Sequence, residues 1–380
     1  MHATLDQGEP IMGNPLLAIH GLGQSIWLDN ISRELLDSGK LASLIAEDGI
    51  SGVTSNPTIF EKAIGHSDLY DGALIAAARE GLEARAIFFR LAYADIRDGA
   101  ELLRPAYDAA DGQDGHISFE LPPELARDVA GSIEAAIRIR DEIDRPNVFI
   151  KVPATPEGVD AFRELTAAGV SVNVTLLFAV ERYEEIANAW IDGLERRVAA
   201  GEPVDRLASV ASFFVSRVDS KVDARLEQLG RADLQGIAAV ANAKLAYRSF
   251  QQLFSGPRWE ALAAKGAHVQ RPLWASTSTK NPAYPDTLYV DTLIGPDTVN
   301  TMPEATIDAV RDHGVAARTI DAKVDVAAAH MAELASIGVD LDQILVHELV
   351  DEGVDSFANS FVSLLTTIAE KAHELAPAQA

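Results

Sequence analysis

The middle of the chain reads Val148-Phe149-Ile150-Lys151-Val152-Pro153-Ala154, a short and mainly apolar run. A longer stretch with helical periodicity follows at residues 156–168, and a β-branched run follows that at residues 170–178. Strand, helix and strand in this order predict two parallel strands joined by a crossover helix. Lys151 stands out, because buried parallel strands are normally apolar on both faces.

The same alternation of strand and helix recurs along the chain. Candidate strands lie at residues 25–30, 52–56, 116–121, 148–154, 170–178, 207–215, 271–276 and 297–302. Helical stretches are expected at residues 31–47, 123–141, 156–168, 179–199, 222–253 and 303–313. Eight such units predict an α/β fold, a (β/α)8 TIM barrel with additional helices.

An open, doubly wound sheet is the main competing fold. That fold favours a G-x-G-x-x-G turn after its first strand, whereas the first strand here runs into Asp29-Asn30-Ile31-Ser32. The sequence therefore favours the barrel.

The chain is longer than the roughly 250 residues of a typical barrel. No linker or low-complexity tract divides it, so we expect residues 1–380 to form a single barrel domain with an N-terminal extension and a C-terminal helical segment. Further helices are expected at residues 60–111. An apolar stripe at helical spacing is expected to dock the last segment on the barrel, and it consists of Phe357, Phe361, Leu364, Leu365 and Ile368.

The composition disfavours several classes of function. The chain has 380 residues, with 32 Lys and Arg against 57 Asp and Glu, a formal net charge of −25 and no cysteine. Nucleic acids and anionic membranes repel so acidic a protein, and without cysteine there is no disulfide or thiolate metal site. No apolar run approaches the roughly 20 residues that span a bilayer, and no secretory signal precedes Arg33, so we expect a cytoplasmic protein.

Polar side chains lie at the carboxyl ends of the predicted strands. Alternation along each strand places Asp29, Glu120 and Lys151 opposite the aliphatic residues that face the helices, and therefore inside the barrel. Other polar residues fall on the inner face or near the strand ends, namely Asn56, Asn173, Thr175, Ser212 and Ser276. Barrel enzymes carry their active sites at this end, so the sequence predicts a polar site there.

Lys151 carries most of this prediction. Each polar residue by itself has a plainer explanation, because strand-end Asp and Asn often cap the next helix and a lysine can reach solvent or pair with a carboxylate. Apolar neighbours, however, leave its ammonium no easy route to solvent except through the barrel mouth. Burial favours the neutral amine, which forms Schiff bases with carbonyl groups. With Asp29 and Glu120 to transfer protons, this set suggests aldol chemistry without a cofactor.

Two cations, Arg217 and Lys280, follow the sixth and seventh predicted strands and would be adjacent at the mouth. They can be ordinary surface charges, but in so acidic a chain they offer a local anion site that suits phosphate. The nine histidines show no H-E-x-x-H spacing, so no metal site is expected. Neither G-x-S-x-G nor a P-loop motif occurs.

Five segments in order resemble the transaldolase family. They are residues 52–60 (GVTSNPTIF), 148–155 (VFIKVPAT), 172–178 (VNVTLLF), 275–282 (ASTSTKNP) and 293–303 (LIGPDTVNTMP), of which the last two resemble the long bacterial subgroup. The resemblance implies a class I aldolase barrel of the non-oxidative pentose phosphate pathway. Such an enzyme transfers a dihydroxyacetone unit from sedoheptulose 7-phosphate to glyceraldehyde 3-phosphate. The products are erythrose 4-phosphate and fructose 6-phosphate, and the reaction also runs in reverse.

The resemblance also implies roles for individual residues. Lys151 would form the Schiff base, Asp29 would remove the proton of the C4 hydroxyl, and Glu120 with Thr175 would manage water and protons. The substrate would be bound at its dihydroxyacetone hydroxyls by Asn56, Asn173 and Ser212, and at its phosphate by Arg217, Lys280 and Ser276. The better-known form has arginine where this chain has Lys280, and lysine holds phosphate as a point charge rather than as a bidentate fork.

Two other functions fit the same barrel. One is a fructose 6-phosphate aldolase-like enzyme that releases free dihydroxyacetone, although enzymes of that kind tend to be shorter and to carry glutamine where this chain has Glu120. The other is a noncatalytic barrel that binds sugar phosphates, although Asp29, Glu120 and Lys151 are all present. We expect small sugar phosphates as partners, and either a monomer or a homodimer.

Overall fold

The computed structural model describes residues 13–375 and contains a closed barrel of eight parallel strands. Each strand pairs with the next along the chain, and the eighth pairs with the first. The strands are β1 (Gln24–Leu28), β2 (Gly52–Val53), β3 (His116–Glu120), β4 (Val148–Pro153), β5 (Val172–Leu177), β6 (Ser209–Phe214), β7 (Arg271–Ala275) and β8 (Thr298–Met302). The predicted (β/α)8 barrel is confirmed. Residues 1–12 of the expected N-terminal extension lie outside the described residues.

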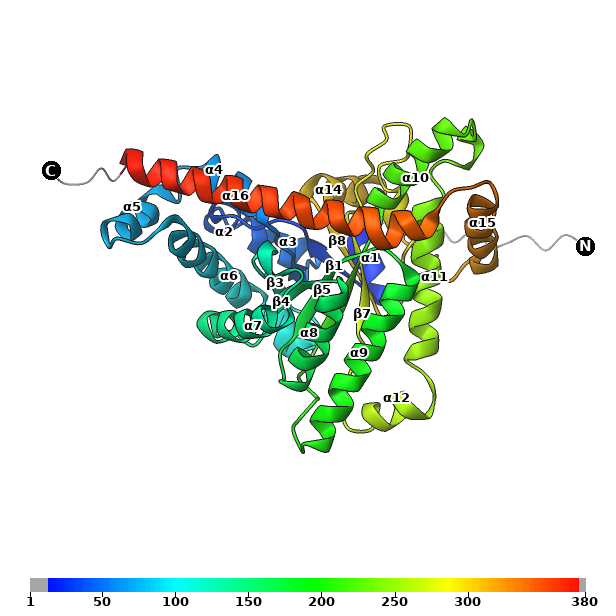
Figure 1. Cartoon of the computed structure of the whole chain (residues 1–380), viewed down its shortest axis with the longest axis horizontal. Helices are drawn as coiled ribbons and strands as arrows, with labels where there is room; N and C mark the ends of the chain where they lie inside the picture. The colour runs from blue at the N-terminus through cyan, green and yellow to red at the C-terminus, as the bar shows by residue number, and fades with distance from the viewer. Residues whose placement is uncertain (1–12, 376–380) are drawn as a thin grey trace, which may run out of the picture.

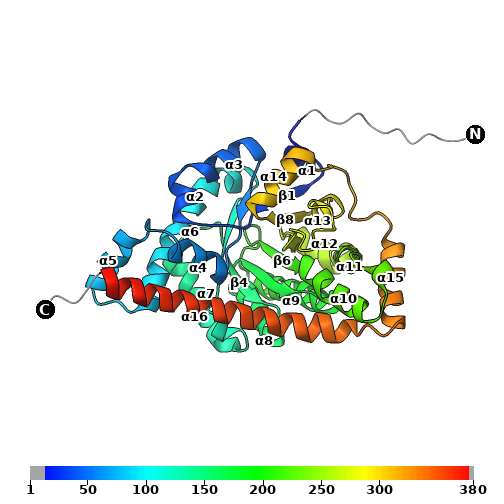
Figure 2. The same cartoon turned by 90° about the horizontal axis from the view of Figure 1, so that it is seen from above.

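Helices surround the barrel on its outer side (Figures 1 and 2). In the first half of the chain they are α1 (Pro15–Gly21), α2 (Arg33–Asp37), α3 (Lys40–Asp48), α4 (Pro57–Gly65), α5 (Asp71–Arg79), α6 (Ala84–Ala109), the 3-10 helix η1 (Pro123–Leu125), α7 (Val129–Ile143) and α8 (Pro156–Ala167). In the second half they are α9 (Val180–Ala199), α10 (Ser216–Gln228), η2 (Ala232–Leu234), α11 (Ala238–Leu253), α12 (Gly256–Ala263), α13 (Leu288–Asp291), α14 (Glu304–His313), α15 (Val324–Ser336), the π-helical η3 (Gln343–Glu348) and α16 (Leu349–Leu375).

Three predicted helices are each divided in the structure. The stretch 31–47 becomes α2 and α3, because Gly39 takes the left-handed conformation at φ 74° and ends one helix before the next begins. The stretch 222–253 becomes α10 and α11, separated by Gly230 and Gly236 at φ 68° and 72°. The stretch 123–141 becomes η1 and α7, whose first turn is capped by Asp128. Helical periodicity predicted where helices lie, but not these breaks.

The second strand is shorter than predicted. Only Gly52 and Val53 are paired on both sides, and the chain then turns away so that the Oδ1 of Asn56 accepts from the Ile59 N–H at 3.0 Å and caps α4. Gly52 lies directly against the Trp27 ring, where an added Cβ would come within 2.4 Å of ring atoms. A side chain at residue 52 would therefore displace the indole that fills the barrel.

The C-terminal helix α16 lies along one side of the molecule, at the edge of the barrel (Figures 1 and 2). It packs mainly on α4, α5 and α6, and also reaches β5 and η1. Most of its apolar stripe is buried, namely Phe357, Phe361, Leu364 and Ile368, whereas Leu365 is only partly buried. The predicted docking of this segment is confirmed. Within residues 13–375, no helix is both long and apolar enough to cross a bilayer.

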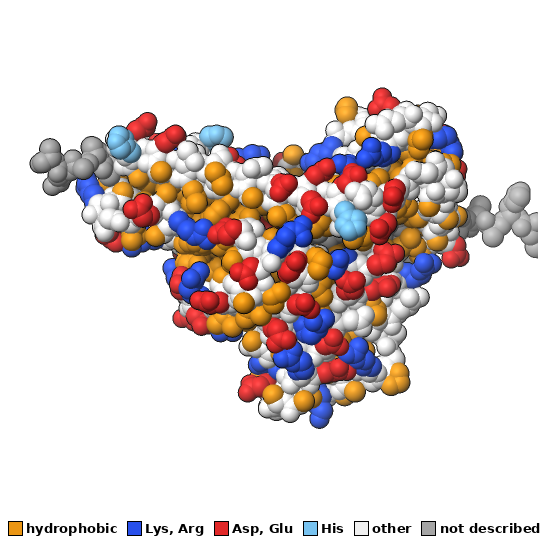
Figure 3. All heavy atoms as spheres, viewed as in Figure 1, with side chains coloured by type: hydrophobic (Ala, Val, Ile, Leu, Met, Phe, Trp, Pro, Cys, Tyr) orange, Lys and Arg blue, Asp and Glu red, His pale blue; other side chains and the backbone are white. Residues whose placement is uncertain are grey.

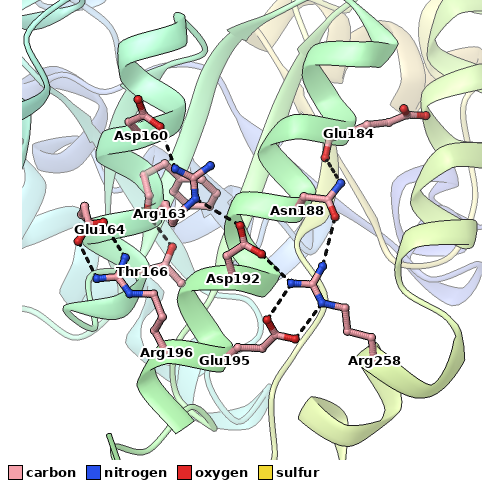
Figure 4. Close-up of polar contacts among 11 residues, drawn as sticks. Asp160, Arg163, Glu164, Thr166, Glu184, Asn188, Asp192, Glu195, Arg196 and Arg258 are labelled. Carbon is pink, nitrogen blue, oxygen red and sulfur yellow. Dashed lines mark hydrogen bonds and ion pairs between the residues drawn. The ribbon is translucent and has the colours of Figure 1, made fainter. Parts of the chain in front are cut away.

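Ion pairs join the outer helices. Arg258 of α12 reaches Asp192 at 2.6 Å and Glu195 at 2.8 Å on α9, and Arg163 of α8 reaches Asp192 at 3.3 Å (Figure 4). Exposed pairs of this kind contribute only about 0–1 kcal/mol each. Acidic and basic side chains mingle over the face in Figure 3, so the net charge does not form one continuous acidic field there.

Polar groups also fill the amino-terminal end of the barrel. Asp114 accepts hydrogen bonds from Trp27 Nε1 at 2.8 Å and from the hydroxyls of Ser25 and Ser51 at 2.5 and 2.8 Å. Its neighbour His116 is buried and stacks on Phe149 with ring centroids 4.1 Å apart. Among the described residues, the Nδ1 of His116 has no hydrogen-bond partner. Burial therefore lowers the pKa of His116 from 6.5 to about 3.

This buried histidine should make the fold sensitive to acid. Between pH 6.5 and about 3 the unfolded chain protonates His116 and the folded chain does not, so this contribution to stability is lost as the pH falls through that window. From pH 7.5 to 5.0 the loss should be about 2 kcal/mol. The free energy of unfolding of His116→Gln should therefore fall less between these two pH values than that of the unmodified protein, by about 2 kcal/mol. Urea denaturation at both pH values measures this difference.

The exposed His66 provides the matched control for that substitution. His66→Gln should keep the pH dependence of the unmodified chain. An equal pH dependence for His116→Gln and the unmodified protein would contradict a neutral, buried histidine.

Candidate active site

Lys151 lies at the carboxyl end of β4, inside the barrel, with only 5% of its surface exposed. Its Nζ donates to the carbonyl oxygen of Ser55 at 2.9 Å and lies 3.2 Å from Oε2 of Glu120. The ammonium is therefore held between the loop after β2 and the end of β3. The local sequence predicted that this lysine lies inside the barrel. It did not predict that the Ser55 carbonyl accepts its hydrogen bond.

Glu120 ends β3 and is the register partner of Lys151. Glu120 also borders a small cavity lined by the rings of Phe60, Phe88, Phe89, Phe119 and Phe361, while its carboxylate contacts Lys151 inside the barrel. Burial inside the barrel raises the pKa of Glu120, and the nearby Lys151 opposes that shift. A buried carboxyl group whose pKa is raised is suited to accepting and donating a proton during a reaction.

Asp29 follows β1 at the same end of the barrel. The hydroxyl of Thr54 donates to Asp29 Oδ1 at 2.7 Å and lies 2.7 Å from the hydroxyl of Thr301 on β8. Thr54 and Thr301 are partners that were not included among the predicted site residues. Alternation places Thr54 on the same face as Asn56, but Thr301 shares a face with the aliphatic Val299, so the same count would not have selected it.

A chain of hydrogen bonds crosses the interior from β6 to β3. Ser212 donates to Asn173 Oδ1 at 2.7 Å, and Asn173 Nδ2 donates to Ser118 Oγ at 3.0 Å. All three side chains are buried. Asn173 is also the register partner of Lys151. These hydrogen-bonded side chains therefore place polar groups directly beside the lysine.

Thr175 lies on β5, where the pairing with β6 changes register between Val174 and Leu177. Leu176 takes a left-handed conformation at φ 56° there, a strained state for a residue with a Cβ. Among the described residues, the buried Thr175 hydroxyl has no hydrogen-bond partner. An unpaired buried hydroxyl inside a polar site suits a ligand or a water molecule.

Arg217, the second residue of α10, lies against two aromatic faces. Its guanidinium carbon is 4.8 Å from the ring centroid of Phe214 and 5.9 Å from that of Phe357 on α16. Burial lowers its pKa, while the charges of Glu120 and Asp29 oppose that shift. No ion pair to Arg217 forms within residues 13–375, so aromatic contacts position the side chain and leave its N–H groups available to an anion.

Lys280 lies in the loop after β7 and reaches solvent. Partial loss of hydration lowers its pKa, and the charges of Arg217 and Lys62 act in the same direction. In the same loop Ser276, at φ 57°, bonds through its hydroxyl to that of Ser216 at 2.9 Å. The two predicted cations thus share one site, joined by a serine pair that the sequence did not reveal.

The structure brings the predicted site residues to one end of the barrel. Asp29, Glu120, Lys151 and Arg217 influence one another electrostatically. Asn56 differs from the prediction in that its side-chain carbonyl already caps α4, although it lines the same cavity as Glu120. In the part of the chain that the structure describes, no cluster of three or more His, Asp or Glu side chains is arranged to hold a metal ion.

A closed barrel with a buried lysine and carboxylate at its carboxyl-end mouth has the organisation of a (β/α)8-barrel enzyme. The sequence profile of the transaldolase/fructose-6-phosphate aldolase family matches residues 26–368. The chain belongs to this family.

Curated relatives match this chain over nearly their whole length. A protein of Frankia alni named transaldolase is 48% identical over 364 residues, which are 95% of this chain and 98% of that protein. A transaldolase of Trichodesmium erythraeum is 45% identical over 377 residues, covering 96% and 99%. A transaldolase of Thermobifida fusca is 48% identical over 364 residues, covering 95% and 99%. The segments that resembled transaldolase thus belong to a chain that matches the family throughout.

Proposed function

We propose that this protein is a transaldolase, which moves a dihydroxyacetone unit from a ketose phosphate to an aldose phosphate through a Schiff base on Lys151. The observation that carries the proposal is the contact between Lys151 Nζ and Glu120 Oε2, 3.2 Å apart and buried at the mouth of the barrel. Relatives that share about half of its residues bear that name.

The first half of the reaction forms the covalent intermediate. Lys151 passes a proton to Glu120, 3.2 Å away, and the resulting amine attacks the ketose C2 carbonyl to give a carbinolamine, which loses water to become a protonated Schiff base. Glu120 donates the proton that leaves with that water, and Thr175 holds the water through its unpaired hydroxyl. Asp29 then takes the proton of the C4 hydroxyl, the C3–C4 bond breaks, and the aldose leaves while the three-carbon enamine stays on the lysine.

The second half reverses these steps on an acceptor. The enamine carbon attacks the aldehyde carbon of the acceptor, and Asp29 returns its proton to the new C4 oxygen. Water then adds to the Schiff base, and Lys151 is released. The dihydroxyacetone hydroxyls are bound by Asn56, Asn173 and Ser212, and the phosphate is bound by Arg217 and Lys280 with Ser276.

Trapping the intermediate tests this proposal. The intact protein would be reduced with borohydride in the presence of fructose 6-phosphate, then weighed and peptide-mapped by mass spectrometry. We expect an adduct of dihydroxyacetone size on Lys151, and its amount should fall when excess erythrose 4-phosphate is present before reduction.

Two other outcomes would identify the alternatives. Steady release of free dihydroxyacetone without acceptor would indicate the aldolase of the same family. Absence of any adduct in protein that binds fructose 6-phosphate would indicate a noncatalytic sugar-phosphate barrel.

Several expectations from the sequence stay predictions. These are a single domain over residues 1–380, a monomer or homodimer, the lack of a nucleic-acid partner or cofactor, and a cytoplasmic location, which fits sugar-phosphate substrates.

A further inference from the structure

Two carboxylates on α10 accept hydrogen bonds from two tyrosine hydroxyls. Tyr289 Oη donates to Asp219 Oδ2 at 2.8 Å, and one turn further along α10, Tyr284 Oη donates to Asp223 Oδ2 at 2.6 Å. Asp219 and Tyr289 are each only 1% exposed. These four residues have no part in the proposed chemistry.

The two pairs join the elements that carry the proposed phosphate ligands. Arg217 is the second residue of α10, two positions before Asp219. Lys280 precedes Tyr284 by four positions on the segment that continues from β7 into α13. Each pair therefore links the helix of Arg217 to the segment of Lys280. The hydroxyls of Ser216 and Ser276, 2.9 Å apart, join the same two elements at the mouth.

The carboxylates do not themselves face the mouth. Residues two positions apart on a helix point to nearly opposite sides, so Asp219 points away from the guanidinium of Arg217. Its other oxygen accepts the Ala239 N–H at 2.7 Å, at the start of α11, and Asp223 accepts the Gly236 N–H at 3.0 Å. Asp219 is thus held from two directions, and it holds α10 in one orientation.

Burying such a carboxylate is costly. Desolvation raises the pKa of Asp219 to about 6, even though it accepts two hydrogen bonds. Capping of α11 alone does not require a buried charge, because a neutral serine or threonine caps a helix comparably well. The second partner, Tyr289, is what distinguishes this carboxylate from an ordinary cap.

We propose that the Asp219–Tyr289 pair, supported by Asp223–Tyr284, positions Arg217 relative to Lys280 and thereby sets the affinity of the site for the substrate phosphate. Asp219 and Tyr289 are positioning residues, since neither touches the substrate. The inference rests on the proposed function, in which Arg217 and Lys280 bind that phosphate.

Tyr289→Phe tests the proposal because it removes one hydroxyl and keeps the ring. We expect KM for fructose 6-phosphate to rise roughly fivefold, as for the loss of one hydrogen bond, with little change in kcat. Binding of inorganic phosphate, measured by calorimetry, should weaken by a similar factor. Turnover of unphosphorylated fructose should not change. Asp219→Asn should give the same pattern, because its single amide oxygen can accept only one of the two hydrogen bonds that the carboxylate accepts.

Tyr247→Phe is the matched control. Tyr247 is also buried, but its hydroxyl donates to the Pro296 carbonyl at 3.1 Å on another part of the barrel. This variant should keep the KM and the phosphate affinity of the unmodified protein.

The outcomes separate this inference from the proposed function. If Arg217→Ala weakens phosphate binding but Tyr289→Phe behaves like Tyr247→Phe, the positioning role is wrong and the phosphate site stands. If Arg217→Ala leaves phosphate binding unchanged, the phosphate site itself is wrong. Equal losses for fructose 6-phosphate and fructose in Tyr289→Phe would show a merely structural pair and would also overturn the inference.

Discussion

Lys151→Met should lose essentially all turnover, with kcat reduced by roughly four orders of magnitude or more. The substitution removes the only atom that can form the proposed Schiff base at this position. It keeps the length of the buried side chain, whose Nζ contacts the Ser55 carbonyl and Glu120. The measurement is the coupled assay of fructose 6-phosphate with erythrose 4-phosphate, together with borohydride trapping, which should yield no adduct.

The variant should nevertheless fold. Without the ammonium, Glu120 becomes a buried carboxylate that has lost its partner, and it responds by taking up a proton, because burial already raises its pKa. Far-UV circular dichroism should match that of the unmodified protein. Lys244→Met on α11 is the control, since this partly buried lysine donates to the carbonyls of Thr319 and Ala322 away from the site. Full activity in Lys151→Met would refute the proposed mechanism.

Glu120→Gln should reduce kcat by roughly 10²- to 10³-fold. The carboxamide has the shape of the carboxyl group but cannot deliver or accept the proton that accompanies water in Schiff-base formation and hydrolysis. Burial inside the barrel raises the pKa of Glu120, and the variant has no titratable group at this position. Rapid-quench borohydride trapping should show that the adduct forms more slowly, while still mapping to Lys151.

Glu124→Gln provides the comparison. Glu124 lies four positions away, is about half exposed, and pairs with Arg85 at the surface, so its substitution should leave kcat unchanged. An unaltered rate of adduct formation in Glu120→Gln would exclude Glu120 from handling the water, whatever the effect on the overall rate.

The strand order and the placement of Lys151 could be predicted from the sequence. Both follow from patterns a few residues long, because alternate residues of a strand face opposite sides and helical residues repeat every 3.6. A lysine among Val148, Ile150 and Val152 therefore had to face inward in any parallel barrel. The same reasoning placed Asp29 and Glu120.

Breaks within helices could not be predicted in this way. The helical pattern of residues 222–253 continues across Gly230 and Gly236, and only the backbone shows that both take left-handed conformations. The shortening of β2 could not be predicted either. Asn56 caps the start of α4 and does not continue the strand.

Sequence by itself thus determined the class of fold, the end of the barrel that carries the candidate site, and the inward position of the lysine and carboxylates there. Tertiary structure alone decided which groups meet them: the Ser55 carbonyl on Lys151, 96 positions away, and Thr301 beside Thr54, 247 positions away. It also brought Phe357 of the last helix against Arg217. The physical reason is that local patterns are set by the geometry of one strand or helix, whereas these contacts exist only once the barrel closes and the last helix docks beside it.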